Sequence, residues 1–229
     1  PQEDAGSVAA IAHIRAMQAL GAKVTFVPAD NMAHLGEITE ALQRIGVEVL
    51  HAPWYWSLEE VVRKRGAEFD AVYLHRYVNA FKYAGLLRAA MPQAKLIYSV
   101  ADLHHLRMQR EAAVTGEDAR LAAAEAMKAR ELGALAAVDQ VIVHSAHEAG
   151  YLAGMLPEER LNVIPWTVPA RPDPRAFAER AGIAFLGGYR HPPNVDAVQF
   201  FAAEVMPHLR RLLPGVAFHI LGSHMPPSF

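Results

Sequence analysis

The stretch Gln140-Val-Ile-Val-His-Ser-Ala-His-Glu148 joins the two kinds of pattern that decide the fold of this chain. Its Val-Ile-Val centre is apolar on both alternate positions, as in a strand buried on both faces of a parallel sheet. Ser145 and Glu148 then have the spacing of a capping box, which opens a helix expected to reach Leu156. The stretch therefore predicts a buried strand followed at once by a helix.

The same alternation continues in both directions along the chain. Other strand-like runs are Lys23–Pro28, Val47–Leu50, Ala71–Leu74, Lys95–Val100, Asn162–Pro165, Ile183–Leu186 and Val216–Leu221. The intervening patterns predict helices over Val8–Leu20, Ser57–Arg65, Asn79–Ala90, Leu103–Ala137 with a break near Thr115–Gly116, and Val195–Leu213 up to Pro214–Gly215. This order predicts an α/β fold with a doubly wound parallel sheet and right-handed crossovers.

Two interruptions divide the pattern. The first helix has no strand before it, so Pro1–Ser7 is interpreted as the loop after a strand that lies ahead of Pro1. Trp166–Arg180 holds three prolines and no apolar period, which is typical of a linker. The β-α-β unit after it has roughly 50 residues, too few to enclose a core. We therefore expect a first domain over 1–166, a linker over 167–181 and an incomplete second domain over 182–229, as in a fragment of a longer protein.

The composition excludes several classes of protein. The 229 residues are 52% hydrophobic, and 22 basic residues nearly balance 24 acidic ones. Neither a disordered chain nor a nucleic-acid-binding protein is expected. The absence of cysteine excludes disulfides, thiolate zinc sites and cysteine nucleophiles, and it fits a reducing compartment. No apolar run approaches the roughly 18 residues of a membrane span.

Common cofactor motifs are also missing. No G-x-G-x-x-G follows a predicted strand and no G-x-x-x-x-G-K-[ST] is present, which disfavours dinucleotide enzymes and P-loop NTPases. His147-Glu148 begins like a zinc-protease motif but lacks its second histidine. The pairs His104/His105 and His144/His147 have no carboxylate cluster beside them, so structural hydrogen bonding is favoured over metal binding.

Polar side chains gather where the predicted strands end. His75, Arg76, Asp102, His104 and Arg107 all follow such ends, and ligands of open parallel sheets bind at the carboxyl ends of strands. Loops are polar in any case, but several with His, Arg and Asp together favour a functional edge. Asp102 can accept a hydroxyl proton as a general base or cap the next helix, and the two roles are compatible.

Three further features allow a functional or an ordinary role. Gly6, at a loop-to-helix junction, can let a phosphate approach a helix N-terminus or can simply serve a turn. Arg190 can offset the charge of a diphosphate or can be a solvated loop residue. The aromatic segment Trp54–Trp56 can stack on a sugar or a lipid, with packing against the sheet edge as the favoured alternative.

The stretch after the linker has a specific pattern. Ile183-Ala-Phe-Leu-Gly-Gly-Tyr-Arg-His-Pro-Pro-Asn-Val-Asp196, followed by Phe200–Pro207 and Phe218–Ser223, resembles the start of the C-terminal domain of retaining GT-B glycosyltransferases of the large family four, or "group 1". Asp4–Ser7 with Gly21–Phe26, and the Ser145 capping box, are similar to that family's N-terminal domain. The resemblance spans nearly the whole chain, and its second-domain stretch is the more specific.

The resemblance implies two Rossmann-like domains with the active site in the cleft between them. The chain would hold the acceptor-side domain and the first β-α-β unit of the donor-side domain. The donor would be a nucleotide sugar and the acceptor a glycan or lipid-linked sugar, with retention of configuration and with no metal or other cofactor. The implied residues are Asp102 for catalysis, Gly6, Ser7, Gly187, Gly188, Arg190 and His191 for the donor phosphates, and His75, Arg76, His104 and Arg107 on the acceptor side.

The chain departs from the family's pattern in two places. Ala101 stands where many relatives carry the histidine of a His-Asp pair. The family's donor-gripping segment, with its E-x7-E glutamates, would lie beyond Phe229, so the fragment is expected to be inactive alone. The family implies work in the cytoplasm, often at the membrane face, on polysaccharide precursors. A sugar-nucleotide epimerase of the same fold and a non-catalytic binding or scaffolding module stay open as alternatives.

Overall fold

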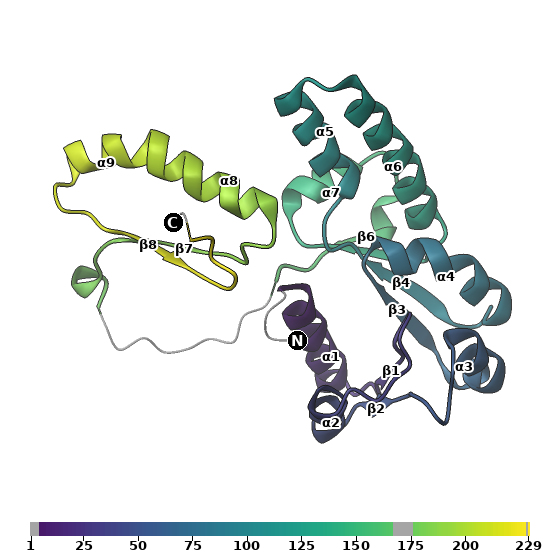
Figure 1. Ribbon diagram of the computed structural model, residues 1–229. Helices are drawn as coiled ribbons and strands as arrows, with labels where there is room; N and C mark the ends of the chain where they lie inside the picture. The colour runs from purple at the N-terminus through teal and green to yellow at the C-terminus, as the bar shows by residue number, and fades with distance from the viewer. Residues whose placement is uncertain (1–4, 167–175, 228) are drawn as a thin grey trace. The chain divides into compact units, whose positions relative to one another are not determined.

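The computed structural model describes residues 5–166, 176–227 and 229 (Figure 1). The chain divides into two compact units, a larger one over Ala9–Thr167 and a smaller one that holds Val168–Phe229 with Pro1–Val8. Asp4 and most of the expected linker, residues 167–175, lie outside the described residues.

Helices and short strands alternate along the larger unit, which makes it an α/β structure as predicted. Its strands are β1 (Thr25–Phe26), β2 (Glu48–Val49), β3 (Ala71–His75), β4 (Lys95–Ser99), β5 (Gln140–Val143) and β6 (Leu161–Val163). Its helices are α1 (Ala5–Ala19), α2 (Glu37–Arg44), α3 (Leu58–Arg65), α4 (Tyr77–Ala90), α5 (His104–Thr115), α6 (Asp118–Ala136) and α7 (Ala146–Leu152), with 3-10 turns at Gly66–Glu68 and Glu158–Arg160.

All strand pairs of the larger unit are parallel. β3, β4, β5 and β6 form one sheet in that order, and β1 pairs with β2 in a second one. Within the described residues, no ladder joins β1 to β3, so the strands do not form the single continuous sheet that the alternation predicted. In the first sheet His75 is opposite Ser99, so the residues that follow β3 and β4 start at the same edge.

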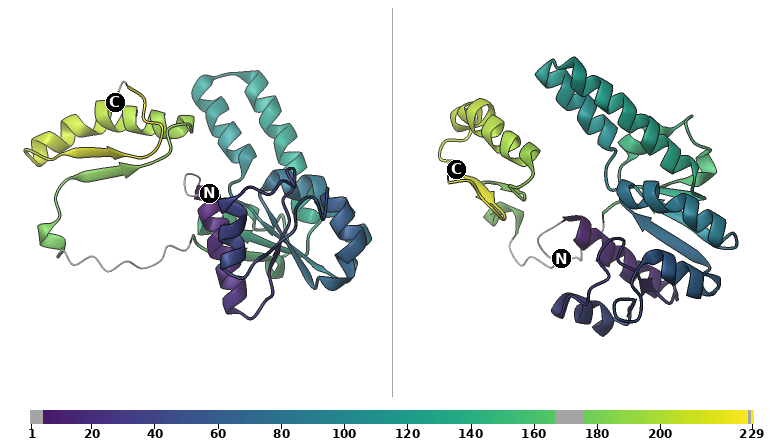
Figure 2. Two further views of the ribbon diagram at one scale, coloured as in Figure 1. Left: turned by 60° about the horizontal axis from the view of Figure 1, so that its bottom comes forward. Right: turned by 45° about the vertical axis from the view of Figure 1, so that its right-hand side comes forward.

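The main core lies between the four-stranded sheet and helices α4 and α6. Leu96 and Val141 on the sheet, Leu87 on α4 and Leu135 on α6 are almost completely buried in one cluster. Helix α1 lies against the opposite face, where His13 contacts Tyr73. Figures 1 and 2 accordingly show helices on both sides of this sheet.

The helix boundaries follow local signals in most places. Ser57 and Ser145 cap α3 and α7 by accepting the N–H groups of Glu60 and Glu148, as the capping boxes predict. The break between α5 and α6 is at Gly116, whose φ of 69° suits glycine. Helix α7 ends at Leu152, short of the expected Leu156, because the backbone of Ala153 leaves the helical region with ψ 131°.

The smaller unit contains one β-α-β arrangement. β7 (Ile183–Leu186) pairs in parallel with β8 (Phe218–Leu221). Between them α8 (Pro192–Phe200) and α9 (Met206–Leu212) are joined by a π turn over Phe201–Val205, and a 3-10 turn precedes β7 at Phe177–Glu179. The predicted single helix is therefore interrupted just before Pro207, which lacks an N–H for the helical ladder. Leu186 and Leu212 are 79% and 77% exposed, so the unit encloses little core.

Candidate functional site

Three of the residues predicted for the sheet edge lie together after β4. The carboxylate of Asp102 is 3.2 Å from Nε2 of His104 and 3.3 Å from Nη1 of Arg107. Its side chain is 45% exposed, so it is accessible to a ligand. His75 ends the neighbouring strand β3 half-buried, and Arg76 follows it as an exposed residue whose backbone N–H donates to the carbonyl oxygen of Ser99.

Asp102 does not cap the following helix, so that alternative role is wrong. Helix α5 begins at His104 with Leu103 as its N-cap residue, and Leu103 offers no side-chain cap. The backbone N–H groups of His104 and His105 instead each donate to the carboxylate of Glu131 at 2.9 Å. A residue of α6 therefore satisfies the first turn of α5, and the carboxylate of Asp102 can face its exposed neighbours.

Glu131 belongs to a buried polar chain behind the edge. Its side chain is 1% exposed and that of His105 is completely buried. His105 Nδ1 is 2.5 Å from the Glu131 carboxylate, and Nε2 is 2.9 Å from the Tyr151 hydroxyl. With Nδ1 donating to Glu131, Nε2 accepts from Tyr151. The structural role expected for His105 is thus confirmed.

Glu131 was not predicted as a site residue because its surroundings in the sequence are apolar. Met127 and Leu135 lie one helical turn before and after it, and all three share the face of α6 that packs into the core. A single acidic residue on such an apolar face was the available signal. Its partners, however, include two backbone N–H groups, which no side-chain motif reveals.

A second polar cluster lies under α1. His13 is hydrogen-bonded to the hydroxyl of Tyr73 and stacks on His144 with ring centroids 5.5 Å apart. His144 Nδ1 donates to the Ile164 carbonyl oxygen at 2.8 Å, which leaves Nε2 to accept from the Ser99 hydroxyl at 3.3 Å. The structural hydrogen bonding predicted for His144 is confirmed, whereas His13 carried no signal in the sequence.

Burial shifts the titration of this cluster. It lowers the pKa of His13, and repulsion from a protonated His144 lowers that pKa further. Burial also raises the pKa of Tyr73 to about 12, against a smaller opposite effect of a hydrogen bond with Ser99. The side chains of His13 and Tyr73 are therefore both neutral at pH 7, as their burial beneath α1 favours.

The lowered pKa of His13 makes stability depend on pH. In the unfolded chain this histidine takes up a proton near pH 6.5, whereas in the folded chain it does so only at a lower pH. The contribution of neutral His13 to the free energy of unfolding is therefore expected to be complete above pH 6.5. It is lost as the pH falls from 6.5 through the lowered pKa of the folded chain. Urea unfolding between pH 7.5 and 5 measures this slope. His13→Gln is expected to flatten it, and the exposed His34→Gln is the control; an equal slope in both variants would refute the assignment.

Arg76 has a backbone conformation that is rare for a side-chain-bearing residue. Its φ is 70° and its ψ 150° as it begins helix α4. Such conformations cost on the order of 1–3 kcal/mol in non-glycine residues, and they cluster at functional sites. This strained backbone therefore marks the end of β3 as a candidate functional position. There the placement of Arg76 is kept at a cost in stability.

We expect Arg76→Gly to stabilise the larger unit. Glycine relieves the strained φ, and its greater freedom in the unfolded chain offsets part of the gain, so the free energy of unfolding should rise by about 1 kcal/mol. Arg63→Gly, at an exposed position inside α3, is expected to lose about 1 kcal/mol under the same urea titration. A comparable loss for Arg76→Gly would show that its side-chain contacts outweigh the strain.

The residues predicted for the donor phosphates are distributed over two elements. Gly187, Gly188, Arg190 and His191 follow β7 in the smaller unit, where the side chains of Arg190 and His191 are exposed. The N–H groups of Gly187 and His191 already donate within the unit, to Leu221 and Gly188. Asn194 donates to the Gly188 carbonyl oxygen at 3.0 Å and shapes the loop.

Gly6 and Ser7 do not lie in a loop, and this part of the prediction is wrong. Both are inside the first turn of α1, which begins at Ala5. The apolar run after Ser7 continues a helix without a break, so the turn inferred from Gly6 was placed too late. The two residues are still near a helix N-terminus, where N–H groups have no intrahelical acceptors.

Neither the protein-family models nor the curated proteins that were compared include one that matches this chain. Over the ranges 5–166 and 176–227, no three His, Asp or Glu side chains gather as metal ligands. No helix in this part of the chain combines the length and the apolar character that crossing a membrane demands.

Proposed function

We propose that this chain is part of a GT-B glycosyltransferase that moves a sugar from a nucleotide-sugar donor to a glycan or lipid-linked acceptor with retention. The larger unit would be its acceptor-side Rossmann-like domain, and the smaller unit the start of its donor-side domain. The observation that carries the proposal is the group of Asp102, His104 and Arg107 at the carboxyl edge of a parallel sheet. That is the edge at which such folds bind ligands.

Asp102 would accept the proton of the acceptor hydroxyl as that oxygen attacks the anomeric carbon. The C–O bond to the diphosphate breaks on the same face, and the diphosphate leaves with the electron pair. His104 and Arg107, both within 3.3 Å of Asp102, would hold the carboxylate in place. His75 and Arg76 would contact the acceptor from the neighbouring strand end.

The donor's phosphates would be bound by exposed cations and loop amides after β7. Arg190 supplies a guanidinium, which can form two parallel hydrogen bonds to a phosphate, and His191 lies beside it. Gly187 and Gly188 would keep the backbone close to the ligand, and Gly6 and Ser7 would contribute the first turn of α1. No metal or other cofactor enters this scheme.

The finer fold is part of the proposal. A single doubly wound sheet requires one more parallel strand to join β1 with β3, because the hydrogen-bonded ladders of the described residues stop between them. We propose that the strand expected ahead of Pro1 occupies this position and that α1 follows it by a right-handed crossover. This gives the larger unit one continuous Rossmann-like sheet.

Two other functions fit part of these observations. A sugar-nucleotide epimerase of the same fold would use the same edge to bind a nucleotide sugar. It would need no acceptor, because it transfers no sugar to a second molecule. A non-catalytic binding or scaffolding module would need no accessible carboxylate at the edge. The exposed Asp102 group favours an enzyme over such a module.

Calorimetry with nucleoside diphosphates tests the class of protein. The full-length gene product is titrated with UDP, GDP and ADP, and saturable binding of one of them is expected. Arg190→Ala is expected to weaken this binding by about tenfold or more, because a charge-assisted hydrogen bond is lost. Absence of binding for all three nucleotides would refute the glycosyltransferase assignment.

A further inference from the structure

Two tryptophans protrude from one short loop of the larger unit. Trp54 and Trp56 follow β2 and are 71% and 69% exposed. The preferred interpretation from the sequence, that this segment packs against the sheet edge, is therefore wrong for both indoles. Exposed tryptophans pair a large apolar ring with a polar N–H, and they often occur where a protein binds a ligand.

Backbone hydrogen bonds anchor both ends of this loop. The N–H of Ala52 donates to the Met32 carbonyl oxygen at 2.7 Å and ties the loop to the segment after β1. The N–H of Trp56 donates to the carboxylate of Glu60 at 2.8 Å, and Ser57 caps the same helix turn. A ligand that stacks on Trp56 therefore has little loop entropy to overcome.

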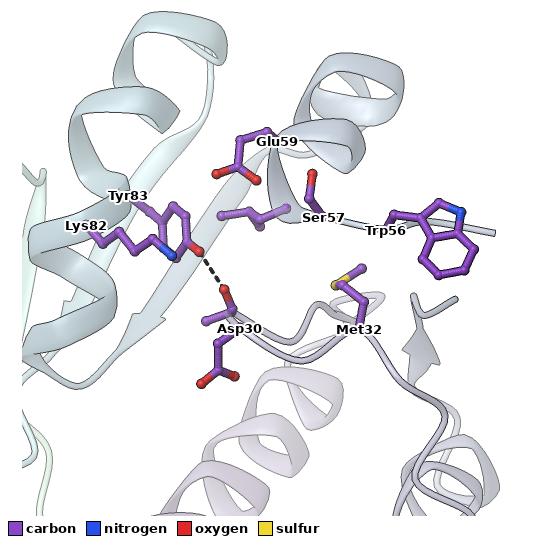
Figure 3. A pocket seen from close by; sticks show the side chains of 9 residues that line it. Asp30, Met32, Trp56, Ser57, Glu59, Lys82 and Tyr83 are labelled. Atoms are coloured by element: carbon purple, nitrogen blue, oxygen red, sulfur yellow. Dashed lines mark hydrogen bonds between the residues drawn. The ribbon is translucent and has the colours of Figure 1, made fainter. Parts of the chain in front are cut away.

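Trp56 borders a hollow of about 210 Å³ between three segments (Figure 3). Its lining comes from the segment after β1, the start of α3 and the middle of α4. The lining residues are Ala29, Asp30, Met32, Trp56, Ser57, Leu58, Glu59, Lys82 and Tyr83. This volume is below the roughly 300–1,000 Å³ of sites for drug-sized ligands, so the hollow suits one small cyclic unit.

Apolar and charged groups divide the hollow. Figure 3 shows Trp56 and Met32 at one end, and Lys82 alongside the ring of Tyr83 at the other. The Lys82 ammonium lies 4.7 Å from the centre of that ring. A hydrogen bond with Tyr83 raises the pKa of Lys82, with smaller contributions from the carboxylates of Glu59 and Asp30. The hollow thus offers an aromatic side chain, the carboxylate of Glu59 and one ammonium group.

We propose that this hollow binds one pyranose unit of a glycan, with Trp56 stacked on the sugar's C–H face. The C–H bonds of a sugar face carry partial positive charge and are attracted by the negative face of an indole. The carboxylate of Glu59 accepts hydrogen bonds from sugar hydroxyls, and Lys82 donates to hydroxyl oxygens. The inference rests on the proposed function for the source of the sugar, which is the acceptor glycan.

A lipid surface fits the same residues less well. Exposed tryptophans also occur where proteins meet membranes, but anionic membranes bind clusters of Lys and Arg. Here the hollow has the carboxylate of Glu59 against the single amine of Lys82. The charge therefore favours a neutral, hydroxyl-rich ligand.

A second hollow, of about 310 Å³, is lined in part by Trp54 and Arg65. The guanidinium of Arg65 is already bound by the carboxylates of Glu48 and Glu68, at 2.8 and 2.7 Å. The polar groups of the hollow at Trp56 are more available, so the sugar is assigned there.

Tryptophan fluorescence of the 229-residue chain tests this site. The chain is titrated with the methyl pyranosides of glucose, galactose, mannose and N-acetylglucosamine, and a saturable emission change is expected with at least one of them. Trp56→Ala is expected to weaken that binding by about tenfold or more, measured by calorimetry because the variant lacks the reporting indole, and Glu59→Gln by about threefold. Trp166→Phe, distant in sequence and in contact with His144, is the control and should bind as the wild type does. Circular dichroism checks that each variant is folded.

The outcomes separate this site from the proposed function. Sugar binding that Trp56→Ala abolishes supports the site even where the full-length product binds no nucleoside diphosphate. Nucleotide binding without any emission change from the four pyranosides overturns the site and leaves the transferase assignment standing. Unchanged sugar affinity in Trp56→Ala, or binding of phosphatidylglycerol vesicles in place of the sugars, also overturns it.

Discussion

Glu131→Ala is expected to lower the free energy of unfolding of the larger unit by about 3–5 kcal/mol. The substitution removes the acceptor of the His104 and His105 N–H groups and leaves His105 buried without its partner at Nδ1. Buried polar groups without partners are costly, and the first turn of α5 loses its cap as well. Urea unfolding followed by circular dichroism measures the loss.

The control lies on the same helix. Glu125 hydrogen-bonds Gln109 at the surface, and Glu125→Ala is expected to change the free energy of unfolding by less than about 0.5 kcal/mol. A loss below about 1 kcal/mol for Glu131→Ala would contradict the view that this carboxylate organises the N-terminus of α5 behind Asp102.

Asp102→Asn is expected to lower the kcat for sugar transfer by the full-length gene product by about 10²–10⁴-fold. Asparagine has nearly the same shape and can keep a hydrogen bond to His104 or Arg107, but it cannot accept the acceptor's proton. The free energy of unfolding should change little, because the Asp102 side chain is 45% exposed. Transfer is measured as nucleoside diphosphate released in the presence of acceptor.

An exposed aspartate provides the matched control for this variant. Asp118 lies in the first turn of α6, away from the edge of the sheet, and Asp118→Asn is expected to leave kcat unchanged. If Asp102→Asn retains wild-type kcat in a folded protein, Asp102 is not the catalytic base and the role assigned to the whole edge group is lost.

The sequence was most informative where one local signal decides the structure. Alternating buried positions located β3, β4 and β5 within a residue or two, and Ser57 and Ser145 each started a helix as their capping boxes predicted. Helix α2 had no such signal, since Gly36 begins it without a side-chain cap, and it was not predicted. The break between β1 and β3 depends on which strands meet in space, which periodicity does not reveal.

The candidate site was predictable in part for the same reason. Asp102, His104 and Arg107 are close in sequence and follow one strand, so a single rule about strand ends brought them together. Glu131 contacts His105 across 26 residues of sequence, and His13 contacts Tyr73 across 60 residues. Residues that act through backbone N–H groups or through a helix packed on a sheet need the tertiary structure to be recognised.

Proton NMR of nucleotide sugars incubated with the full-length gene product tests whether this chain belongs to a retaining glycosyltransferase. We expect that one nucleotide sugar loses its sugar to an acceptor glycan, that the new anomeric signal has the configuration of the donor, and that Asp102→Asn suppresses its appearance. Conversion of the sugar into its epimer with the nucleotide still attached, or no turnover of any nucleotide sugar, would contradict the claim that this chain belongs to a retaining glycosyltransferase.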